Sequence, residues 1–260
     1  MRQIYPVTDS APCWPIPGRV APSAAAEPGV AALVDWLAAT YAYPDKLWVR
    51  ANMVASVDGA ITVDGRSAGL SGAADRLVFS ILRSLADVIV VGASTVRAER
   101  YGRAKVANIW PQLRAGRPAA PPLAVVTKSL DLGSRLMSDP EGGDLIALTT
   151  RQAPADRRDG VSGVAQLLEA GEHHVDAAVA VAALAGCGYR RILVEGGPFL
   201  LSQLVAAGAL DELCLTISPV LAGGRAARMT TGPDQLLTEL GLAAVLEDDG
   251  FLLCRYLRAG

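Results

Sequence analysis

The apolar positions of this chain fall into short runs separated by amphipathic segments. Residues 47–56 alternate between apolar and polar side chains and end in an Asp58-Gly59 turn, whereas Val88–Val91 is apolar throughout. Alternation is typical of a strand with one buried face, and a short continuous apolar run is typical of a strand buried on both faces. The same reasoning predicts further strands at 123–127, 144–150, 192–194, 211–224 and 250–258.

Several of the segments between these strands have apolar residues at helical spacing. Apolar residues from Leu77 to Leu85 recur on one helical face after Ser71, a residue type that caps helices. Strands that alternate with helices predict an α/β fold with a mostly parallel sheet. The last two strands have no helical pattern between them, so we expect an antiparallel C-terminal end. Further helices are predicted at 30–41, 175–186 and 198–208.

The N-terminal segment differs in composition from the rest. Residues 1–30 are rich in proline and alanine and show no steady period. This composition predicts an extended arm that wraps on the domain or on a partner subunit. We therefore divide the chain into an arm with a short helix, residues 1–45, and one domain, residues 46–260.

Composition and charge narrow the functional classes. The chain has 260 residues, of which 51% are hydrophobic and 19% charged, with a formal net charge of −2. This balance gives no support for nucleic acid or an anionic membrane as a partner. No apolar run approaches the roughly 18 residues of a membrane span, and the N-terminus lacks the apolar centre of a secretory signal. We expect a cytoplasmic protein.

Metal-binding and thiol patterns are also missing from the sequence. The four cysteines, Cys13, Cys187, Cys214 and Cys254, form no CxxC pair, and the two histidines are adjacent in a polar stretch. We predict no metal site and no Cys–His catalytic pair. The last three cysteines lie among apolar residues and are predicted to be reduced core thiols. Cofactor-dependent chemistry without a metal remains open.

The stretch RRILVEGGPFLL combines a strand, a glycine turn and a helix start. Glu195 follows the apolar run 192–194, and Gly196, Gly197 and Pro198 lead into the helix. Backbone N–H groups at a helix start bind phosphate readily where glycines let a ligand approach. The turn can equally be only a tight connection. A carboxylate at the C-terminal end of a strand is a candidate substrate contact, or the partner of an arginine such as Arg190 or Arg191.

Four blocks, in order, carry a family resemblance: NMVASVDG, SGAADRLVFSILRSLADVIVVGASTVRAE, VVTKS and RRILVEGGPFLLSQLVAAGALDELCLTISPVLAGG. Together they resemble the reductase domain of the bifunctional riboflavin-biosynthesis deaminase/reductase, and still more its stand-alone actinobacterial relatives, over residues 46–258. The resemblance implies a dihydrofolate-reductase-like three-layer αβα fold and a homodimer. It also implies NADPH-dependent hydride transfer to 5-amino-6-(5-phosphoribosylamino)uracil. The deaminase half with its zinc signature is absent from this sequence.

The resemblance assigns cofactor-binding roles to residues at strand exits. The Gly-Gly-Pro turn would hold the pyrophosphate, and the trio after strand 123–127 would bind the adenosine 2′-phosphate. Without the family, Thr95 is best interpreted as a helix N-cap. The implied cofactor residues are Val54, Gly69, Thr95, Glu99, Thr127, Lys128, Ser129, Gly196, Gly197, Pro198 and Phe199.

Substrate-side roles fall to fewer residues. Ser67 and Arg83 match positions that contact the ribosyl phosphate or its base, and Glu195 matches a carboxylate that faces the substrate. For Arg83 a solvated helix position is the plainer interpretation. The proton is predicted to come from water near Glu195 or Asp75, because neither histidine is placed to donate it.

One helix departs from the family pattern. Asp75 and Phe79 are four residues apart and therefore share a helix face. In dihydrofolate reductases an Asp and a Phe at this spacing hold the pteridine ring, so dihydrofolate or another pterin is an alternative substrate. An Asp favoured by the helix dipole beside a core Phe explains the pair equally well.

Glu99 stands where many relatives have Asp, and residues 100–105 differ from their phosphate-contacting loop. As an alternative to a reductase, the chain can be a regulator that binds NADPH without catalysing a reaction.

Overall fold

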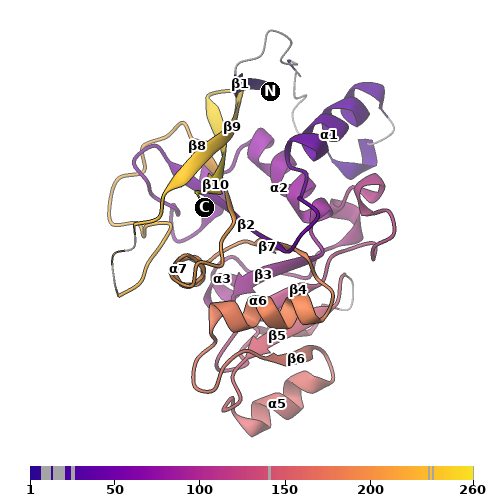
Figure 1. Cartoon of the computed structure of the whole chain (residues 1–260), viewed down its shortest axis with the longest axis vertical. Coiled ribbons are helices and arrows are strands. Elements are labelled where there is room, and N and C mark those ends of the chain that lie inside the picture. Colours follow the sequence, from indigo (N-terminus) through magenta and orange to yellow (C-terminus); the bar gives the residue numbers. More distant parts are fainter. Residues whose placement is uncertain are drawn as a thin grey trace.

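A ten-stranded mixed sheet forms the centre of the molecule (Figure 1). The computed structural model describes residues 1–6, 13, 21–24, 27–139, 142–233, 235 and 237–259. The strands are β1 (Arg2–Tyr5), β2 (Trp48–Ser56), β3 (Val88–Gly92), β4 (Leu123–Val126), β5 (Leu145–Thr149), β6 (Gln166–Glu169), β7 (Arg191–Val194), β8 (Glu212–Ser218), β9 (Leu240–Asp248) and β10 (Phe251–Arg258). Their order across the sheet is β1-β9-β10-β8-β2-β7-β3-β4-β5-β6.

Helices cover both faces of this sheet. They are α1 (Pro28–Thr40), α2 (Ala73–Leu85), α3 (Ala93–Ala98), α4 (Ser134–Met137), α5 (Ala155–Ser162), α6 (Ala177–Gly186) and α7 (Pro198–Ala206). Short 3-10 turns occur at Pro22–Ala24, Ser67–Leu70, Val106–Asn108 and Pro111–Arg114. No helix in the described part of the chain has the length and apolar character that crossing a bilayer requires.

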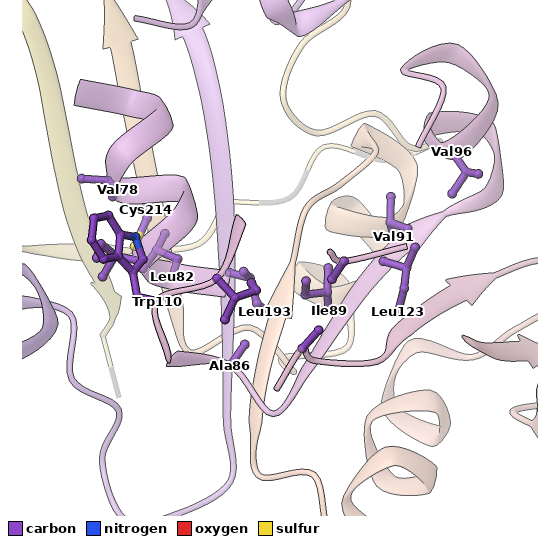
Figure 2. Close-up of a cluster of buried hydrophobic side chains, with 14 of the residues drawn as sticks. Val78, Leu82, Ala86, Ile89, Val91, Val96, Trp110, Leu123, Leu193 and Cys214 are labelled. Carbon is purple, nitrogen blue, oxygen red and sulfur yellow. The ribbon is translucent and has the colours of Figure 1, made fainter. Parts of the chain in front are cut away.

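The alternation of strand residues explains the three layers. In β3, Ile89 and Val91 join α1, α2 and the indole of Trp110 in one core cluster, part of which Figure 2 shows. Val88 and Val90 point the other way and pack with α6 and α7 in a second cluster. Successive strand side chains face opposite sides of a sheet, so a wholly apolar strand requires cover on both faces. The predicted α/β fold with three layers is confirmed.

The strand order leaves a crevice at the carboxyl ends of three central strands. Strand β7 lies between β2 and β3, which are consecutive in the chain, and pairs in parallel with both. The register places Val194 beside Ala51 and Val90, so the residues that follow in each strand meet at one edge. In open α/β sheets such a switch in strand order is where ligands bind.

The C-terminal half of the sheet is antiparallel, as predicted. Strand β10 pairs antiparallel with both β8 and β9. Strands β6 and β9 and helix α5 were not predicted; β6, QLLE, is too short for a clear pattern, and β9 is buried only over three successive residues in its second half.

The N-terminal arm is more regular than predicted where it is described. Arg2–Tyr5 forms an edge strand on β9, so this part of the arm lies on its own domain. The rest of the extended-arm prediction falls largely on residues 7–12, 14–20 and 25–26, outside the described residues.

Two local predictions are wrong. The N-cap of α2 is Gly72 rather than Ser71, and no side chain caps this helix. The Ser71 hydroxyl instead donates to the Asp75 carboxylate at 2.5 Å. Cys187 is exposed, whereas Cys214 and Cys254 are buried free thiols. Cys187 ends α6 in the connection to β7, and its apolar neighbours in sequence did not reveal that position.

Candidate active site

A cleft with two lobes lies at the carboxyl ends of β2, β3, β4 and β7. One lobe has a volume of about 480 Å³ and the other about 790 Å³. The two share Ser94, Gly197, Pro198 and Ala227 in their walls. We call the smaller the inner lobe and the larger the outer lobe. A third cavity, of about 990 Å³, lies between α7 and residues 228–232, 235, 237, 238 and 240, and none of the predicted site residues is among its described lining residues.

The Gly-Gly-Pro turn forms the boundary between the lobes. Gly196 has φ +84°, a backbone conformation that favours glycine. Its carbonyl accepts a hydrogen bond from the Gly92 N–H at 2.9 Å, which joins the turns after β7 and β3. A β-carbon on Gly197 would come within 2.4 Å of the Thr95 hydroxyl oxygen. Pro198 begins α7, and Phe199, 59% exposed, lines the outer lobe.

The outer lobe is basic. Arg97, Lys128 and His174 line it, and the described lining residues include no carboxylate. Thr127 and Ser129 lie in the same wall, at the exit of β4. The Thr127 residue is only 3% exposed, and its hydroxyl finds no hydrogen-bond partner within the described structure. Since buried hydroxyls are normally satisfied, this lobe has the charge and the free donors that suit an anion.

The inner lobe has the opposite charge. Asp75, Glu99 and Glu195 line it, against a single basic side chain, Arg76, among its described lining residues. Val54 and Ser67 also line this lobe. Gly69 and Gly196 are not among the described lining residues of either lobe; Gly69 packs near Val63 instead.

Asp75 and Phe79 both face the inner lobe. The Asp75 residue is 8% exposed, and burial raises the pKa of its carboxyl although hydroxyls of Ser71 and Thr216 donate to it. A buried carboxylate with so few partners can accept hydrogen bonds from a ligand, and a neighbouring aromatic ring can cover a flat heterocycle. The shared helix face predicted from their spacing places both side chains in one cavity.

Glu195 forms an ion pair with Arg83. The Arg83 Nε and Nη2 atoms donate to the two carboxylate oxygens at 2.7 and 2.6 Å. The alternative that Glu195 pairs with an arginine is therefore confirmed, although the partner is Arg83 and not Arg190 or Arg191, and the interpretation of Arg83 as a solvated residue is wrong. Arg83 is not among the described lining residues of the inner lobe, so it reaches the lobe through Glu195.

Tyr101 is a site residue that sequence reasoning did not find. Its side chain lines the inner lobe, and its hydroxyl donates to Glu195 Oε2 at 3.0 Å. The residue lies in the loop interpreted from the sequence only as a departure from the family pattern. Its place depends on a backbone reversal at Arg100, for which the sequence RYG gave no signal.

Two further predicted residues, Glu99 and Thr95, and Asp58 in the turn after β2 make contacts with neighbouring backbone. Glu99 accepts a hydrogen bond from the Ser67 N–H at 2.7 Å and so fixes the loop before α2. Thr95 is not an N-cap: Gly92 holds that position in α3, and the Thr95 hydroxyl lies against Gly197. Asp58 accepts from the Ser56 hydroxyl and from the N–H groups of residues 222 and 223, which lowers the pKa of Asp58 to about 2.

Comparison with known proteins identifies the family. The RibD C-terminal domain family matches residues 47–251, most of the chain.

The chain belongs to the RibD C-terminal domain family.

Curated members of this family give the same result. The chain is 32% identical to the 2,5-diamino-6-ribosylamino-4(3H)-pyrimidinone 5′-phosphate reductase of Archaeoglobus fulgidus, over 68% of this chain and 83% of that protein. It is 31% identical to the protein of the same name from Methanothermobacter thermautotrophicus, over 70% of this chain and 82% of that protein. The resemblance inferred from the four sequence blocks is confirmed.

Solved structures share the fold. A pyrimidine reductase-like protein from Corynebacterium diphtheriae superposes with a TM-score of 0.71 at 24% identity, covering 86% of this chain and 98% of that one. The Saccharomyces cerevisiae riboflavin biosynthesis reductase Rib7 superposes with a TM-score of 0.62 at 15% identity, covering 87% and 99%. At these identities the structures establish the RibD C-terminal fold and nothing more.

A metal site among the described residues would require a group of side chains that could bind the ion. No group of three or more His, Cys, Asp or Glu side chains that could hold a metal ion occurs in the described part of this RibD C-terminal domain. The side chains that converge on the cleft are suited to binding organic ligands and anions.

Proposed function

We propose that this chain is an NADPH-dependent reductase of 2,5-diamino-6-ribosylamino-4(3H)-pyrimidinone 5′-phosphate. The observation that carries the proposal is the charge difference between the two lobes on either side of Gly197: the outer lobe is basic and the inner lobe acidic. Family membership and the names of the curated relatives support the same activity.

The outer lobe fits NADPH. The Thr95 hydroxyl lies where a side chain at position 197 would be, so this position requires glycine, and Gly197 precedes the start of α7, where backbone N–H groups suit a pyrophosphate. Pro198 and Phe199 begin the helix beside it. Lys128, Ser129 and the unpartnered Thr127 hydroxyl supply charge and donors for a 2′-phosphate. Val54 lines the inner lobe, where the nicotinamide would enter.

The inner lobe favours a pyrimidine that carries a 2-amino group. Asp75 is the buried acceptor of this lobe, and an amino group with a ring N–H presents two donors to a carboxylate. A uracil has a carbonyl at that position, and its oxygen cannot donate a hydrogen bond to the Asp75 carboxylate. We therefore propose the diaminopyrimidinone named for the curated relatives in place of the uracil derivative expected from the sequence.

The chain contributes orientation and a proton path. Bound NADPH supplies the hydride that reduces the C=N or masked carbonyl carbon of the ribosylamine. Asp75 and Phe79 hold the ring, and Glu195 faces the same lobe. Glu195 is paired at two points with Arg83, which holds its side chain in place in the wall of the lobe. The proton would come from water held near Glu195 or Asp75, whose carboxylates both line this lobe.

The first experiment follows NADPH oxidation by its absorbance. The purified chain is offered the diaminopyrimidinone ribosyl phosphate, the corresponding uracil derivative and dihydrofolate in parallel. The proposal expects a higher kcat/KM for the diaminopyrimidinone than for the uracil, and binding of NADPH in the absence of any substrate. NADPH binding without oxidation by any of the three compounds would support the non-catalytic regulator.

Dihydrofolate or a related pterin is the second candidate substrate. It rests on the joint presence of Asp75 and Phe79 in the inner lobe, because a pterin presents the same 2-amino-4-oxo edge as the diaminopyrimidinone. The acidic character of this lobe, with one lining arginine, also suits a ring without a phosphate. Oxidation of NADPH with dihydrofolate alone would establish this candidate and reject the first.

We also propose that the enzyme is a homodimer in the cytoplasm. The homodimer follows from the family resemblance, and a cytoplasmic location suits a proposed substrate and cofactor that are both soluble metabolites. Light scattering on the purified chain measures the oligomeric state directly, and a monomer at micromolar concentration would contradict the first part.

A further inference from the structure

We propose that Tyr101 is a positioning residue which, together with Arg83, fixes the Glu195 carboxylate so that one acceptor site on Oε1 remains for the substrate. The inference rests on the proposed function, because it assumes that the substrate occupies the inner lobe. None of the sequence motifs or the comparisons assigns a role to Tyr101.

The end of helix α3 places Tyr101. Arg100 has φ +54°, and its N–H donates to the Arg97 carbonyl at 3.4 Å while the Tyr101 N–H donates to the Val96 carbonyl at 2.9 Å. These two bonds form a Schellman motif, in which a left-handed residue ends a helix and turns the chain back. Arg100 occupies the position where glycine is usual. The reversal carries the tyrosine side chain back toward the end of β7.

Three donors then meet on Glu195. Oε1 accepts from Arg83 Nε at 2.7 Å. Oε2 accepts from Arg83 Nη2 at 2.6 Å and from the Tyr101 hydroxyl at 3.0 Å. A carboxylate has about four lone-pair sites, so one site is left, and it lies on Oε1. This arrangement selects a ligand that presents one N–H or O–H donor to Oε1.

The surroundings keep this arrangement rigid. The Glu195 side chain is 1% exposed and that of Arg83 is 17% exposed. The Arg83 guanidinium carbon lies 4.3 Å from the Phe79 ring centre and 5.7 Å from the Tyr101 ring centre, so two aromatic rings contact it. Burial, and then the Glu195 charge, raise the pKa of Tyr101 well above its usual value. The phenol therefore stays protonated and remains a donor.

Removing only the hydroxyl tests the proposal. Tyr101→Phe keeps the ring against Arg83 but frees a second acceptor site and lets the carboxylate rotate. A hydrogen bond to a charged group is worth roughly a tenfold change or more in an equilibrium constant, so KM for the substrate is expected to rise about tenfold. The Kd for NADPH is expected to change less than KM, because Tyr101 does not line the outer lobe, which would hold the phosphates of the cofactor. Tyr189→Phe, in the connection between α6 and β7, is the matched control.

A double-mutant cycle separates positioning from direct contact. If Tyr101 acts through Glu195, then Tyr101→Phe changes KM by less than about twofold when Glu195→Gln is already present, because effects on one interacting pair are not additive. Additive effects would mean that Tyr101 contacts the substrate itself, and an unchanged KM in Tyr101→Phe would mean that its hydroxyl has no role in binding. Either result overturns the proposal while leaving the reductase intact. A wild-type chain that binds NADPH but reduces no heterocycle would instead remove the proposed function and this inference with it.

Discussion

Gly197, the N-cap of α7 after β7, and Thr95, in the first turn of α3 after β3, are in contact at the floor of the cleft. A β-carbon on Gly197 would lie 2.4 Å from the Thr95 hydroxyl oxygen and 3.8 Å from its β-carbon. The backbone bond from the Gly92 N–H to the Gly196 carbonyl keeps the two turns together. This contact forms the floor where the inner and outer lobes meet.

Gly197→Ala should therefore weaken cofactor binding. The added methyl group must displace the Thr95 hydroxyl, and the resulting shift would move the backbone N–H groups of the turn that is proposed to hold the pyrophosphate. We expect the Kd for NADPH to rise at least about tenfold, which corresponds to about 1.4 kcal/mol, measured by fluorescence titration. Gly186→Ala is the control, because a β-carbon there meets no atom within 4 Å. Equal affinities in the two variants would contradict the assignment of this turn to the cofactor.

Asp75→Asn should lower the affinity for the substrate and raise the unfolding temperature of the protein. The amide loses the charge that attracts the amino edge of the ring, and a bond to a charged group is worth roughly 1.5–3 kcal/mol. We expect kcat/KM to fall at least about tenfold while the Kd for NADPH is retained. A retained kcat/KM would show that Asp75 is structural.

The stability effect of Asp75→Asn depends on pH. Burial raises the pKa of Asp75 from its usual 3.8, so the folded protein binds this proton more tightly than the unfolded chain. The stabilisation is fully present below pH 3.8 and is lost as the pH rises through the folded pKa. The Asn variant should thus gain in unfolding temperature over the wild type as the pH rises from 4 to 8. A constant difference over this range would contradict the assigned direction.

Lys128→Gln should change cofactor preference. Lys128 lines the outer lobe at the exit of β4, where it would pair with the 2′-phosphate that distinguishes NADPH from NADH. We expect the Kd for NADPH to rise roughly tenfold with that for NADH unchanged, as for the loss of one charge-assisted bond. Lys46→Gln is the control, because Lys46 precedes β2 at the opposite end of the sheet. A similar rise in Kd for both cofactors would mean that Lys128 contacts a part of the cofactor other than the 2′-phosphate.

Glu212→Gln should destabilise the fold without touching the cleft. The side chain of Glu212 is fully buried and pairs with Arg50 at 2.8 Å and Arg255 at 2.7 Å. Breaking a buried ion pair costs about 3–5 kcal/mol, which urea unfolding would measure. Burial opposes ionisation of Glu212, but the two arginines lower its pKa below 4.5, so this stabilisation should also be lost as the pH falls below that value. Glu239→Gln, at an exposed position, should have little effect.

Local patterns determined the architecture of this chain. The wholly apolar strand Val88–Val91 required cover on both faces, and helices were found on both. The strand–glycine–helix pattern around Gly197 predicted a glycine turn at a strand exit, which the structure confirms, and the four-residue spacing placed Asp75 and Phe79 on one face. These predictions depend only on residues close together in sequence, for which strand and helix periods are reliable guides.

Tertiary structure decided which distant residues meet. The pairing of Glu195 with Arg83 instead of its neighbours Arg190 and Arg191 follows from the insertion of β7 between β2 and β3, which no local pattern encodes. The role of Tyr101 depends on the left-handed backbone conformation at Arg100. This conformation cannot be predicted from an arginine, because glycine is the residue type that usually adopts it. The opposite charges of the two lobes arise because residues from several strand exits converge on one edge of the sheet. The sequence by itself determined the elements and the residue types at their ends, and only the order of strands in the sheet decided which of those ends form one site.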